Sequence, residues 1–299
     1  MSTLLNLIRN FIEVRHDAKK CTMSTLRHAK INDLLRQLPE GLPVDAAWLR
    51  ARGYSSNLLR KYEAAGLLSQ PAHRVYVRPR GPLVWQQLVI SLQTLLARDL
   101  VVGGRTALDL HGVSHYIEAA TQAVCLYGAK APPTWLRNVE AGVEFRARND
   151  ARIFKSALAS TAPHKLDAST DHRSTRSDGA MTMPWGPWNW PLTVSTPERA
   201  ILELLDELPN GESFHQADVL IEGLATLSPT RLQALLIDCH NIKVKRLFFF
   251  FADRHSHSWL KRLDRASIEL GSGKRSLVKG GRYDAKHMIT VPEDLDAPG

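Results

Sequence analysis

Hydrophobic positions between residues 43 and 80 recur in a pattern that predicts two short helices followed by a two-stranded hairpin. In the second helix, apolar side chains from Leu58 to Ala65 fall at intervals of three and four, which places them on one buried face. Gly53 and Gly66 follow the two helices, at positions where glycine readily takes the left-handed backbone conformation that ends a helix. This order of elements is typical of a winged helix-turn-helix, whose second helix enters the major groove of DNA.

Residues outside that buried face supply candidates for contact with DNA. Asn and Arg side chains make specific hydrogen bonds with adenine and guanine edges, and hydroxyl groups at a helix N-terminus contact phosphate. Lys and Arg also displace counterions from the DNA backbone, so an excess of cations strengthens the prediction. Residues 24–82 contain 10 Lys and Arg against 4 Asp and Glu. The candidate DNA-binding residues are Ser55, Ser56, Asn57, Arg60, Lys61, His73, Arg74, Arg78 and Arg80.

The alternative interpretation is that this module is an ordinary helical segment with a solvated charged face. Helix-turn-helix patterns arise by chance, and most charged residues are simply exposed to solvent. The local charge favours DNA binding, because no acidic residue lies between Glu63 and Asp99.

Further boundaries of the module follow from its apolar spacing and its prolines. Residues 24–38 are expected to form its first helix. Pro43 is expected in the first turn of the next helix, and Gln70–Ala72 in the turn of the hairpin.

Beyond the module, helical and strand-like patterns alternate. A strongly apolar helix at 83–98 is expected to pack between the module and the next domain. A polar segment at 161–181 is expected to form a solvated insertion. The Trp- and Pro-rich segment after it predicts an aromatic plug in the core, with base stacking as the alternative. Helices are also expected at Thr106–His111, from Pro197, from Phe214, at Pro229–Cys239 and through Leu247–Phe251, and strands at Ala123–Tyr127, Val143–Arg148, Ser267–Leu270 and Met288–Val291.

These elements predict an α+β fold, in which an N-terminal winged helix-turn-helix is followed by a mixed α/β C-terminal domain. The expected organisation is an N-terminal extension at 1–23, the winged helix at 24–82, and an α+β domain at 83–299 that carries the polar insertion. The first four residues recur from Met23 onwards, which leaves open whether translation begins at Met1 or at Met23.

Net charge and cysteine content indicate the kind of partner and the cellular compartment. The chain of 299 residues carries a formal charge of +9, which favours an anionic partner such as nucleic acid. Cys21, Cys125 and Cys239 are odd in number and far apart, which argues against a disulfide framework and fits a reducing, cytoplasmic environment. No apolar run is long enough to cross a membrane, and Arg9 interrupts the stretch that would otherwise resemble a signal peptide.

Motifs for catalysis, cofactors and metals are weak. Gly271–Ser276 resembles a phosphate-binding loop, but Ile268 stands where that loop needs an earlier glycine. His255 and His257 lack a third ligand at metal spacing. Glu269 is followed by Leu and Gly, which breaks the Glu-x-Lys pattern of restriction-type nucleases. The sequence therefore predicts no catalytic residue, no cofactor and no metal site.

Longer motifs resemble the AbiEi-like family, the transcriptional regulators and antitoxins of type IV abortive-infection systems. Near the C-terminus the matching segments are KVKRLFFFFADRHSHSWLKRLD (243–264) and IELGSGKRSLVKGGRYDAKHMITVP (268–292). STPERAILELLDELP (195–209) and GRTALDLHG (104–112) are similar to the family's middle region, and the winged helix lies where the family carries its own. The resemblance covers residues 24–292 in the family's order, and this sequence departs from it in the N-terminal extension and the polar insertion.

The resemblance implies a non-enzymatic antitoxin in two parts. The winged helix would repress its own operon by binding double-stranded DNA at inverted repeats in the promoter. The C-terminal domain would counteract a nucleotidyltransferase-like toxin in phage defence, with direct contact between the two proteins left open. The same basic surface would alternatively contact DNA a second time, or RNA, since the toxin's substrates would be nucleotides or tRNA. The candidate antitoxicity surface consists of Lys243, Lys245, Arg246, Lys274, Arg275, Lys279 and Arg282.

Two other functions stay open on the sequence alone. One is a nucleic-acid-modifying enzyme, supported only by the Gly-rich basic loop and by the scattered carboxylates Asp253, Asp264 and Glu269. The other is a plain transcriptional repressor without a toxin, which a neighbouring nucleotidyltransferase gene would rule out. The operator sequence, the toxin's substrate and the oligomeric state do not follow from the residues.

Overall fold

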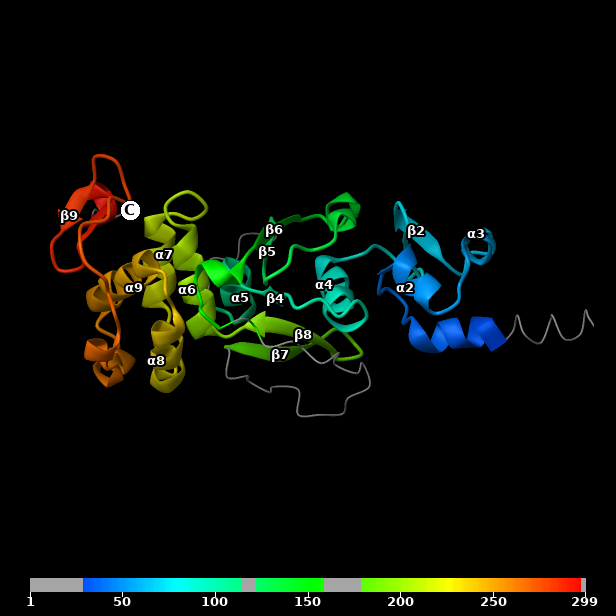
Figure 1. Cartoon of the computed structure of the whole chain (residues 1–299), viewed down its shortest axis with the longest axis horizontal. Helices are drawn as coiled ribbons and strands as arrows, with labels where there is room; N and C mark the ends of the chain where they lie inside the picture. Colours follow the sequence, from blue (N-terminus) through cyan, green and yellow to red (C-terminus); the bar gives the residue numbers. More distant parts are fainter. Residues whose placement is uncertain (1–28, 114–121, 157, 159–178, 297–299) are drawn as a thin grey trace, which may run out of the picture.

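The structure is a computed structural model that describes residues 29–113, 122–156, 158 and 179–296. It is elongated, with a small module at the N-terminal end, a mixed sheet in the middle and a group of helices with a short hairpin at the C-terminal end (Figure 1). Buried hydrophobic side chains of the described residues form one core inside the module and one on each side of the sheet. The predicted α+β fold class is confirmed.

The N-terminal module is a winged helix. Its elements in chain order are a helix at 29–37, β1 (Val44–Asp45), α2 (Ala46–Ala51), α3 (Ser56–Ala64), β2 (Ser69–Ala72) and β3 (Val75–Val77). Leu38, Leu49 and Leu59 are fully buried between the helices and a sheet of order β1-β3-β2. Gly53 and Gly66 follow α2 and α3 with positive φ, as the sequence predicts.

Two local predictions in the module are wrong. Pro43 does not begin a helix: it precedes β1, and the Asp45 carboxylate caps α2 by accepting a hydrogen bond from the Trp48 amide at 2.8 Å. Gln70–Ala72 belongs to β2, and the hairpin turn follows at residues 73–74. Because β2 is an edge strand, it tolerates Pro71 without losing a hydrogen bond inside the sheet.

The helix α4 (Trp85–Thr94) connects the module to the central sheet, as the sequence predicts. On the module side, the Trp48 indole donates a hydrogen bond to the Leu95 carbonyl at 2.8 Å. On the sheet side, the Gln93 side chain donates to the Thr193 carbonyl and accepts from the Thr193 amide, both at 2.9 Å. The module is therefore packed against the rest of the chain through α4.

The central part contains β4 (Val101–Val102), α5 (Gly104–Leu110), β5 (Ala123–Tyr127), η1 (Thr134–Asn138), β6 (Glu144–Arg148), η2 (Asp150–Arg152), β7 (Ala180–Trp185) and β8 (Trp190–Ser195). The sheet has the order β6-β5-β4-β8-β7, in which β5–β6 and β4–β8 are parallel. The predicted strands at β5 and β6 are confirmed. The predicted insertion at 161–181 lies largely outside the described residues, but its last two residues begin β7.

The Trp- and Pro-rich segment forms the tip of the β7–β8 hairpin, which the sequence does not predict. Trp185 and Trp188 both stack on Trp190, at ring-centroid distances of 6.3 and 5.2 Å. Trp190 is buried, whereas Trp188 is 48% exposed. The segment thus fills part of the core through Trp190, as expected, and also presents an exposed aromatic ring, Trp188, at the surface.

The C-terminal part contains α6 (Pro197–Glu207), α7 (Phe214–Glu222), α8 (Pro229–Asp238), α9 (Ile242–His255), η3 (Ser258–Arg262), η4 (Arg265–Ser267), β9 (Arg282–Asp284), β10 (Ile289–Val291) and η5 (Glu293–Asp296). The four predicted helices are confirmed. The four consecutive phenylalanines of α9, residues 248–251, are all buried, as expected for a helix surrounded by protein. The strand predicted at Ser267–Leu270 is wrong, because Asp264 caps a short turn there by accepting a hydrogen bond from the Ala266 amide at 3.1 Å.

A group of buried charges lies where α6 meets the sheet. Arg199 and Glu203 are one turn apart on α6 and are at most 1% exposed, with Arg199 Nε donating to Glu203 Oε1 at 2.8 Å. The other carboxylate oxygen, Oε2, accepts from the Gly104 amide at 2.9 Å, and the Ser195 hydroxyl donates to Oε1 at 3.1 Å. Burial raises the pKa of Glu203, while Arg199 and these donors act in the opposite direction. One carboxylate thus connects α6, α5 and the end of β8.

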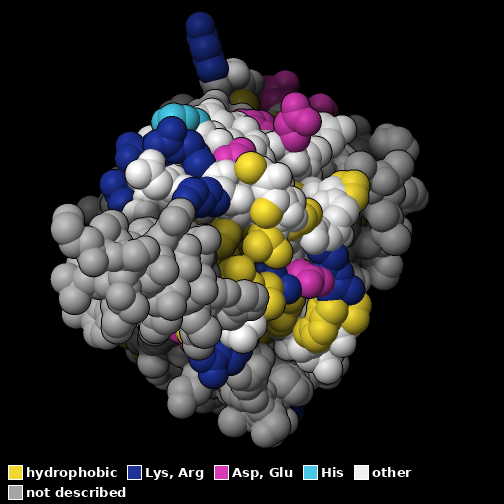
Figure 2. All heavy atoms as spheres, turned by 90° about the vertical axis from the view of Figure 1, so that its right-hand side faces the viewer, with side chains coloured by type: hydrophobic (Ala, Val, Ile, Leu, Met, Phe, Trp, Pro, Cys, Tyr) yellow, Lys and Arg dark blue, Asp and Glu magenta, His cyan; other side chains and the backbone are white. Residues whose placement is uncertain are grey.

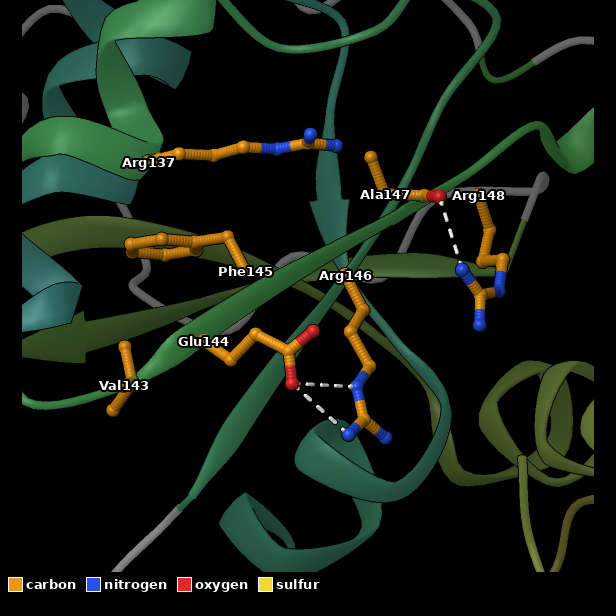
Figure 3. A pocket seen from close by; sticks show the side chains of 7 residues that line it. All are labelled: Arg137, Val143, Glu144, Phe145, Arg146, Ala147 and Arg148. Carbon is orange, nitrogen blue, oxygen red and sulfur yellow. Dashed lines mark hydrogen bonds and ion pairs between the residues drawn. The ribbon is translucent and has the colours of Figure 1, made fainter.

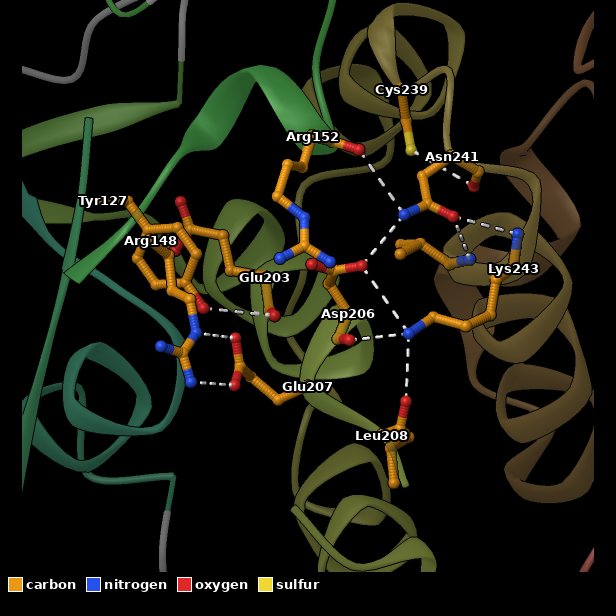
Figure 4. A network of polar contacts seen from close by, with 11 residues as sticks. Tyr127, Arg148, Arg152, Glu203, Asp206, Glu207, Leu208, Cys239, Asn241 and Lys243 are labelled. Atoms are coloured by element: carbon orange, nitrogen blue, oxygen red, sulfur yellow. Dashed lines mark hydrogen bonds and ion pairs between the residues drawn. The ribbon is translucent and has the colours of Figure 1, made fainter. Parts of the chain in front are cut away.

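Two further pairs tie the end of α6 to its neighbours (Figure 4). Arg148 on β6 makes a bidentate ion pair with Glu207, at 2.6 and 2.7 Å. Lys243 on α9 donates to the carbonyl oxygens of Asp206 and Leu208, at 2.6 and 2.9 Å. A cation at the C-terminal end of a helix also interacts favourably with the helix dipole.

We expect Glu203→Gln to lower the free energy of unfolding by about 3 kcal/mol, because it removes the nearer of the two carboxylates that compensate the buried Arg199, the other being Asp150 at 3.4 Å. Chemical denaturation of the purified protein measures this change. Glu222→Gln is the matched control, since Glu222 is exposed at the end of α7, and we expect it to change the free energy by less than about 0.5 kcal/mol. Equal stability of the two variants would contradict a structural role for the Glu203 charge.

Candidate nucleic-acid interface and C-terminal basic surface

The helix α3 presents most of the candidate DNA-binding residues on its exposed face. Ser55 caps the helix, its hydroxyl accepting a hydrogen bond from the Leu58 amide at 3.4 Å. Leu59 and Tyr62 point into the core of the module. The remaining candidates on this helix are therefore exposed, and they are Ser56, Asn57, Arg60 and Lys61.

Within this face, Arg60 and Asn57 lie one turn apart and interact. Arg60 Nη2 donates a hydrogen bond to Asn57 Oδ1 at 2.7 Å. The bond uses one of the five N–H donors of the guanidinium, so the others stay available to donate to a base edge or a phosphate. It also leaves the amide N–H groups of Asn57 free to act as donors.

The tip of the wing consists of His73 and Arg74, both exposed. Arg74 has a φ of 60°, in the left-handed region that side chains other than glycine rarely adopt. A glycine would fit this turn with less strain, yet the sequence places a long cation there. Figure 2, which faces this end of the molecule, shows Lys and Arg side chains gathered beside a histidine, with a mixed apolar and acidic surface next to them.

Two other predicted wing residues, Arg78 and Arg80, make contacts inside the protein. Arg78 Nη1 donates to the carbonyls of Leu35 and Leu38, at 3.2 and 3.0 Å, and its Nη2 pairs with Glu40 at 2.8 Å. Arg78 therefore closes the C-terminal end of the helix at 29–37. The Arg80 guanidinium lies 3.4 Å from the centre of the exposed Trp188 ring, which joins the module to the β7–β8 hairpin.

Three members of the predicted antitoxicity surface do not belong to an open surface. Lys243 is held at the end of α6, where burial lowers its pKa and Asp206 opposes that shift. Lys245 and Arg246 are 3% and 1% exposed. Arg246 donates to the carbonyl of Leu270 at 2.8 Å and to that of Gly273 at 2.6 Å. These cations lie on α9, which is enclosed on most sides, and periodicity in so apolar a helix could not separate buried from exposed charges.

The other four residues of that surface are exposed and lie on β9 or the loop before it, which together with β10 we call the C-terminal hairpin, at the opposite end of the molecule from the winged helix (Figure 1). They are Lys274, Arg275, Lys279 and Arg282. Lys274 lies over the Tyr283 ring, with Nζ 4.7 Å from its centre. The backbone of Arg275 bonds to Met288 and Thr290, at 2.9 and 3.1 Å, and fixes the loop against β10.

Asp253 holds this hairpin to α9. Its carboxylate pairs with Arg265 and with Lys286, and accepts a bond from His287 at 3.0 Å. The other ring nitrogen of His287 meets Asp284 at 2.8 Å. Partial burial would raise the pKa of Asp253, but these donors outweigh it and hold the pKa well below its usual range. This cluster is invisible in the sequence, apart from the i,i+3 spacing of Asp284 and His287.

The carboxylates considered for catalysis are not gathered into one site. Asp253 is occupied by its cationic partners, Asp264 caps η4, and Glu269 is exposed on the loop that follows. Among the described residues, no group of three or more His, Cys, Asp or Glu is placed to hold a metal ion. Nor does any described helix combine the length and apolar character needed to cross a membrane.

A helix, a strand, a helix-turn-helix and a two-stranded wing define a winged-helix protein, here continued by an α+β domain. A family model described as "Transcriptional regulator, AbiEi antitoxin N-terminal domain" matches residues 27–119. A second, "Transcriptional regulator, AbiEi antitoxin, Type IV TA system", matches residues 121–292. The chain belongs to the AbiEi family of antitoxins and transcriptional regulators of type IV toxin–antitoxin systems, as its motifs suggest.

A solved structure shares the fold. The crystal structure of the RV2827C protein from Mycobacterium tuberculosis is similar over 87% of this chain and 88% of that chain, with a TM-score of 0.52 and 15% sequence identity. No curated protein sequence matches the chain significantly. At so low an identity the structural similarity concerns the fold alone.

The Asp253 cluster predicts a specific response to acid. Because the folded-state pKa of Asp253 lies below the unfolded value, its contribution to stability is present above about pH 4 and is lost as the pH falls toward the folded pKa. We expect Asp253→Asn to be less stable than the wild type at neutral pH, and the difference to shrink as the pH falls below about 4. Urea denaturation at a series of pH values tests this, and a difference independent of pH would contradict it.

Proposed function

We propose that α3 reads operator DNA through the major groove and that the wing holds the neighbouring backbone. The observation that carries the proposal is the exposed set Asn57, Arg60 and Lys61 on a helix whose opposite face is fixed in the core. Arg to guanine and Asn to adenine are favoured bidentate pairs, each worth about 1–3 kcal/mol of discrimination. Membership in a family of transcriptional regulators supports this use of the winged helix.

The other exposed candidates would position the protein on DNA. Ser55 and Ser56 lie at the N-terminus of α3, where the helix dipole favours a phosphate. His73 and Arg74 at the wing tip would contact the backbone or enter the minor groove. We assign Arg78 and Arg80 a different role from that expected, because their guanidinium groups already hold the wing to the helix at 29–37 and to Trp188.

We further propose that the protein represses its own operon at inverted repeats and counteracts a nucleotidyltransferase-like toxin encoded beside it. The four exposed cations of the C-terminal hairpin would supply the antitoxicity surface. Their positive charge would attract an anion, such as nucleic acid bound by the toxin. An enzyme is the weaker alternative. Asp253 is engaged in ion pairs with Arg265 and Lys286, and the other two candidate carboxylates, Asp264 and Glu269, lie apart from it. Loss of antitoxicity in an Asp253→Ala variant would therefore reflect loss of structure as readily as loss of catalysis.

We expect Arg60→Ala with Lys61→Ala to abolish specific binding to the DNA upstream of the gene. Arg60→Ala alone should reduce the preference for operator over unrelated DNA by about tenfold or more, because it removes a base contact. Lys61→Ala alone should weaken binding to both DNAs and reduce the slope of log K against log salt by about one, because it removes one cation from the helix that faces DNA. Electrophoretic mobility shifts at several salt concentrations measure both effects.

Arg36→Ala is the matched control for these variants, since Arg36 is an exposed cation of the same module on the helix at 29–37. It should leave both the affinity and the salt slope unchanged. Arg78→Ala should lower the melting temperature and should not relax sequence preference. An unchanged ratio of operator to unrelated binding in the double variant would refute the assignment of α3.

For the antitoxicity surface, we expect Lys274→Ala with Arg275→Ala to weaken protection in cells that co-express the neighbouring toxin. Lys261→Ala with Arg262→Ala is the matched control, because it removes the same exposed Lys-Arg pair from η3. Operator binding should be normal in both variants, which separates this test from that of the winged helix. Full protection by a variant in which all four hairpin cations are replaced by Ala would exclude this surface.

A further inference from the structure

The strand β6 lies at one margin of the central sheet, along the upper side of the molecule in Figure 1. Among the described strands it pairs only with β5, so no described strand covers its outer edge. Exposed sheet edges are templates for pairing with another chain, and proteins usually protect them with charged side chains, proline, bulges or a covering segment. The opposite edge strand, β7, contains Pro184, whereas β6 has the sequence EFRAR, which lacks proline and carries charges of both signs. Such charges repel a strand of like charge and pair with a strand of complementary charge.

The hydrogen bonds to β5 show which groups of β6 face outward. The Glu144 amide donates to Gln122 at 2.9 Å, and the Arg148 carbonyl accepts from Gly128 at 3.1 Å. Because successive residues of a strand point their backbone groups to opposite sides, Phe145 and Ala147 direct their N–H and C=O groups away from β5. A groove lined by Arg137 and Val143–Arg148 runs along this edge, and Arg137 extends toward it from η1 (Figure 3).

The side chains of β6 are arranged in a self-complementary way. Glu144 and Arg146 lie on one face, are 65% and 42% exposed, and pair with each other at 3.0 Å. Phe145 lies on the other face, in the core. Arg148 is held by Glu207, so its side chain is not available to pair with a partner strand. Its Nη1 also donates to the Ala147 carbonyl at 3.4 Å, a bond that a partner strand would replace (Figure 3).

We propose that β6 pairs antiparallel with β6 of a second copy of this chain, with Phe145 opposite Phe145. In this register Glu144 of each copy lies opposite Arg146 of the other, and Ala147 lies opposite Val143. The outward groups of Phe145 form a hydrogen-bonded pair across the twofold axis, and the strands share about six backbone hydrogen bonds. The two five-stranded sheets become one continuous sheet with closed twofold symmetry.

Charge selects this register over its neighbours. Shifting the axis to Arg146 places two Arg146 side chains opposite each other and Glu144 opposite Arg148, whose guanidinium is already engaged by Glu207. Shifting the axis to Ala147 places Arg146 opposite Arg148. Like charges directly opposite in a sheet are destabilising, whereas opposite charges contribute about 0.2–1 kcal/mol a pair. A second copy is favoured over a foreign acidic strand because the edge itself carries both signs of charge. The inference is independent of DNA binding, since it concerns the free protein.

The test exchanges the two charges. We expect the weight-average mass of the wild type, measured by sedimentation equilibrium of the full chain, to rise from monomer toward dimer with concentration. Glu144→Arg and Arg146→Glu should each weaken this association by about tenfold or more, because two attractive pairs become two repulsive ones. The double variant Glu144→Arg, Arg146→Glu should restore it, since both attractive pairs return in the reversed order.

Disulfide cross-linking between copies tests the proposed register of the β6–β6 pair. Val143→Cys in one preparation and Ala147→Cys in another should form a mixed disulfide when combined, because directly opposite residues have Cα atoms about 5.5 Å apart. Neither preparation alone should link through these positions, since each would face the wrong residue. Circular dichroism confirms that every variant is folded.

Several results would overturn the proposal. They are a wild type that stays monomeric at all concentrations and gives no mixed disulfide, a dimer that tolerates both single charge reversals, and a double variant that stays dissociated although folded. Loss of binding to a different protein in Glu144→Arg, with self-association unchanged, would assign the edge to that protein instead.

Discussion

The carboxylate of Glu203 is the constraint around which the rest of the chain is organised. It lies in the interior with Arg199 beside it, and it accepts hydrogen bonds from the start of α5 and the end of β8. Gly103 has no room for a side chain, because a Cβ there would overlap this carboxylate and the Tyr127 ring. A buried ion pair adds little net stability compared with apolar packing, but it penalises any arrangement that leaves one charge alone. The sheet and α6 are therefore restricted to one mutual position.

Burial divides the cations of this basic chain into two populations. Arg199, Lys243 and Arg246 fix internal junctions by donating to carboxylates or to carbonyl oxygens that end helices and loops. The exposed population is spread along the described part of the molecule, from α3 and the wing, past Lys130 and Arg152 in the central part, to the loop that carries Lys274 and Arg275. Excess positive charge alone would suggest one continuous basic surface. The structure instead removes part of this charge from the surface, because these buried cations are used at internal junctions.

Much of the fold could be predicted from the sequence, because the signals are local. The caps at Gly53 and Gly66, the apolar face of α3 and the phenylalanines of α9 each follow from spacing alone. The failures are positions decided by long-range contacts. The β7–β8 hairpin was missed because its strands carry Trp and Pro in an order typical of loops. Arg78 and Arg246 look like surface cations in sequence, and only their carbonyl partners, 24 to 43 residues away, show otherwise. Which exposed candidates touch DNA or a toxin depends on partners outside the chain.

The bonds between Gln93 and Thr193 span 100 residues, and this separation has a consequence for synthesis on the ribosome. One face of α4 is covered as soon as the winged helix folds, but the face toward the sheet stays uncovered until β8 has been made. At about 5–20 residues per second, the nascent chain exposes Leu88, Val89 and Leu92 for roughly 5–20 s. During that interval the growing polypeptide carries a folded winged helix together with a helix, α4, whose apolar face is exposed. Its vulnerability to aggregation, and its need for a chaperone, should be greatest in that interval.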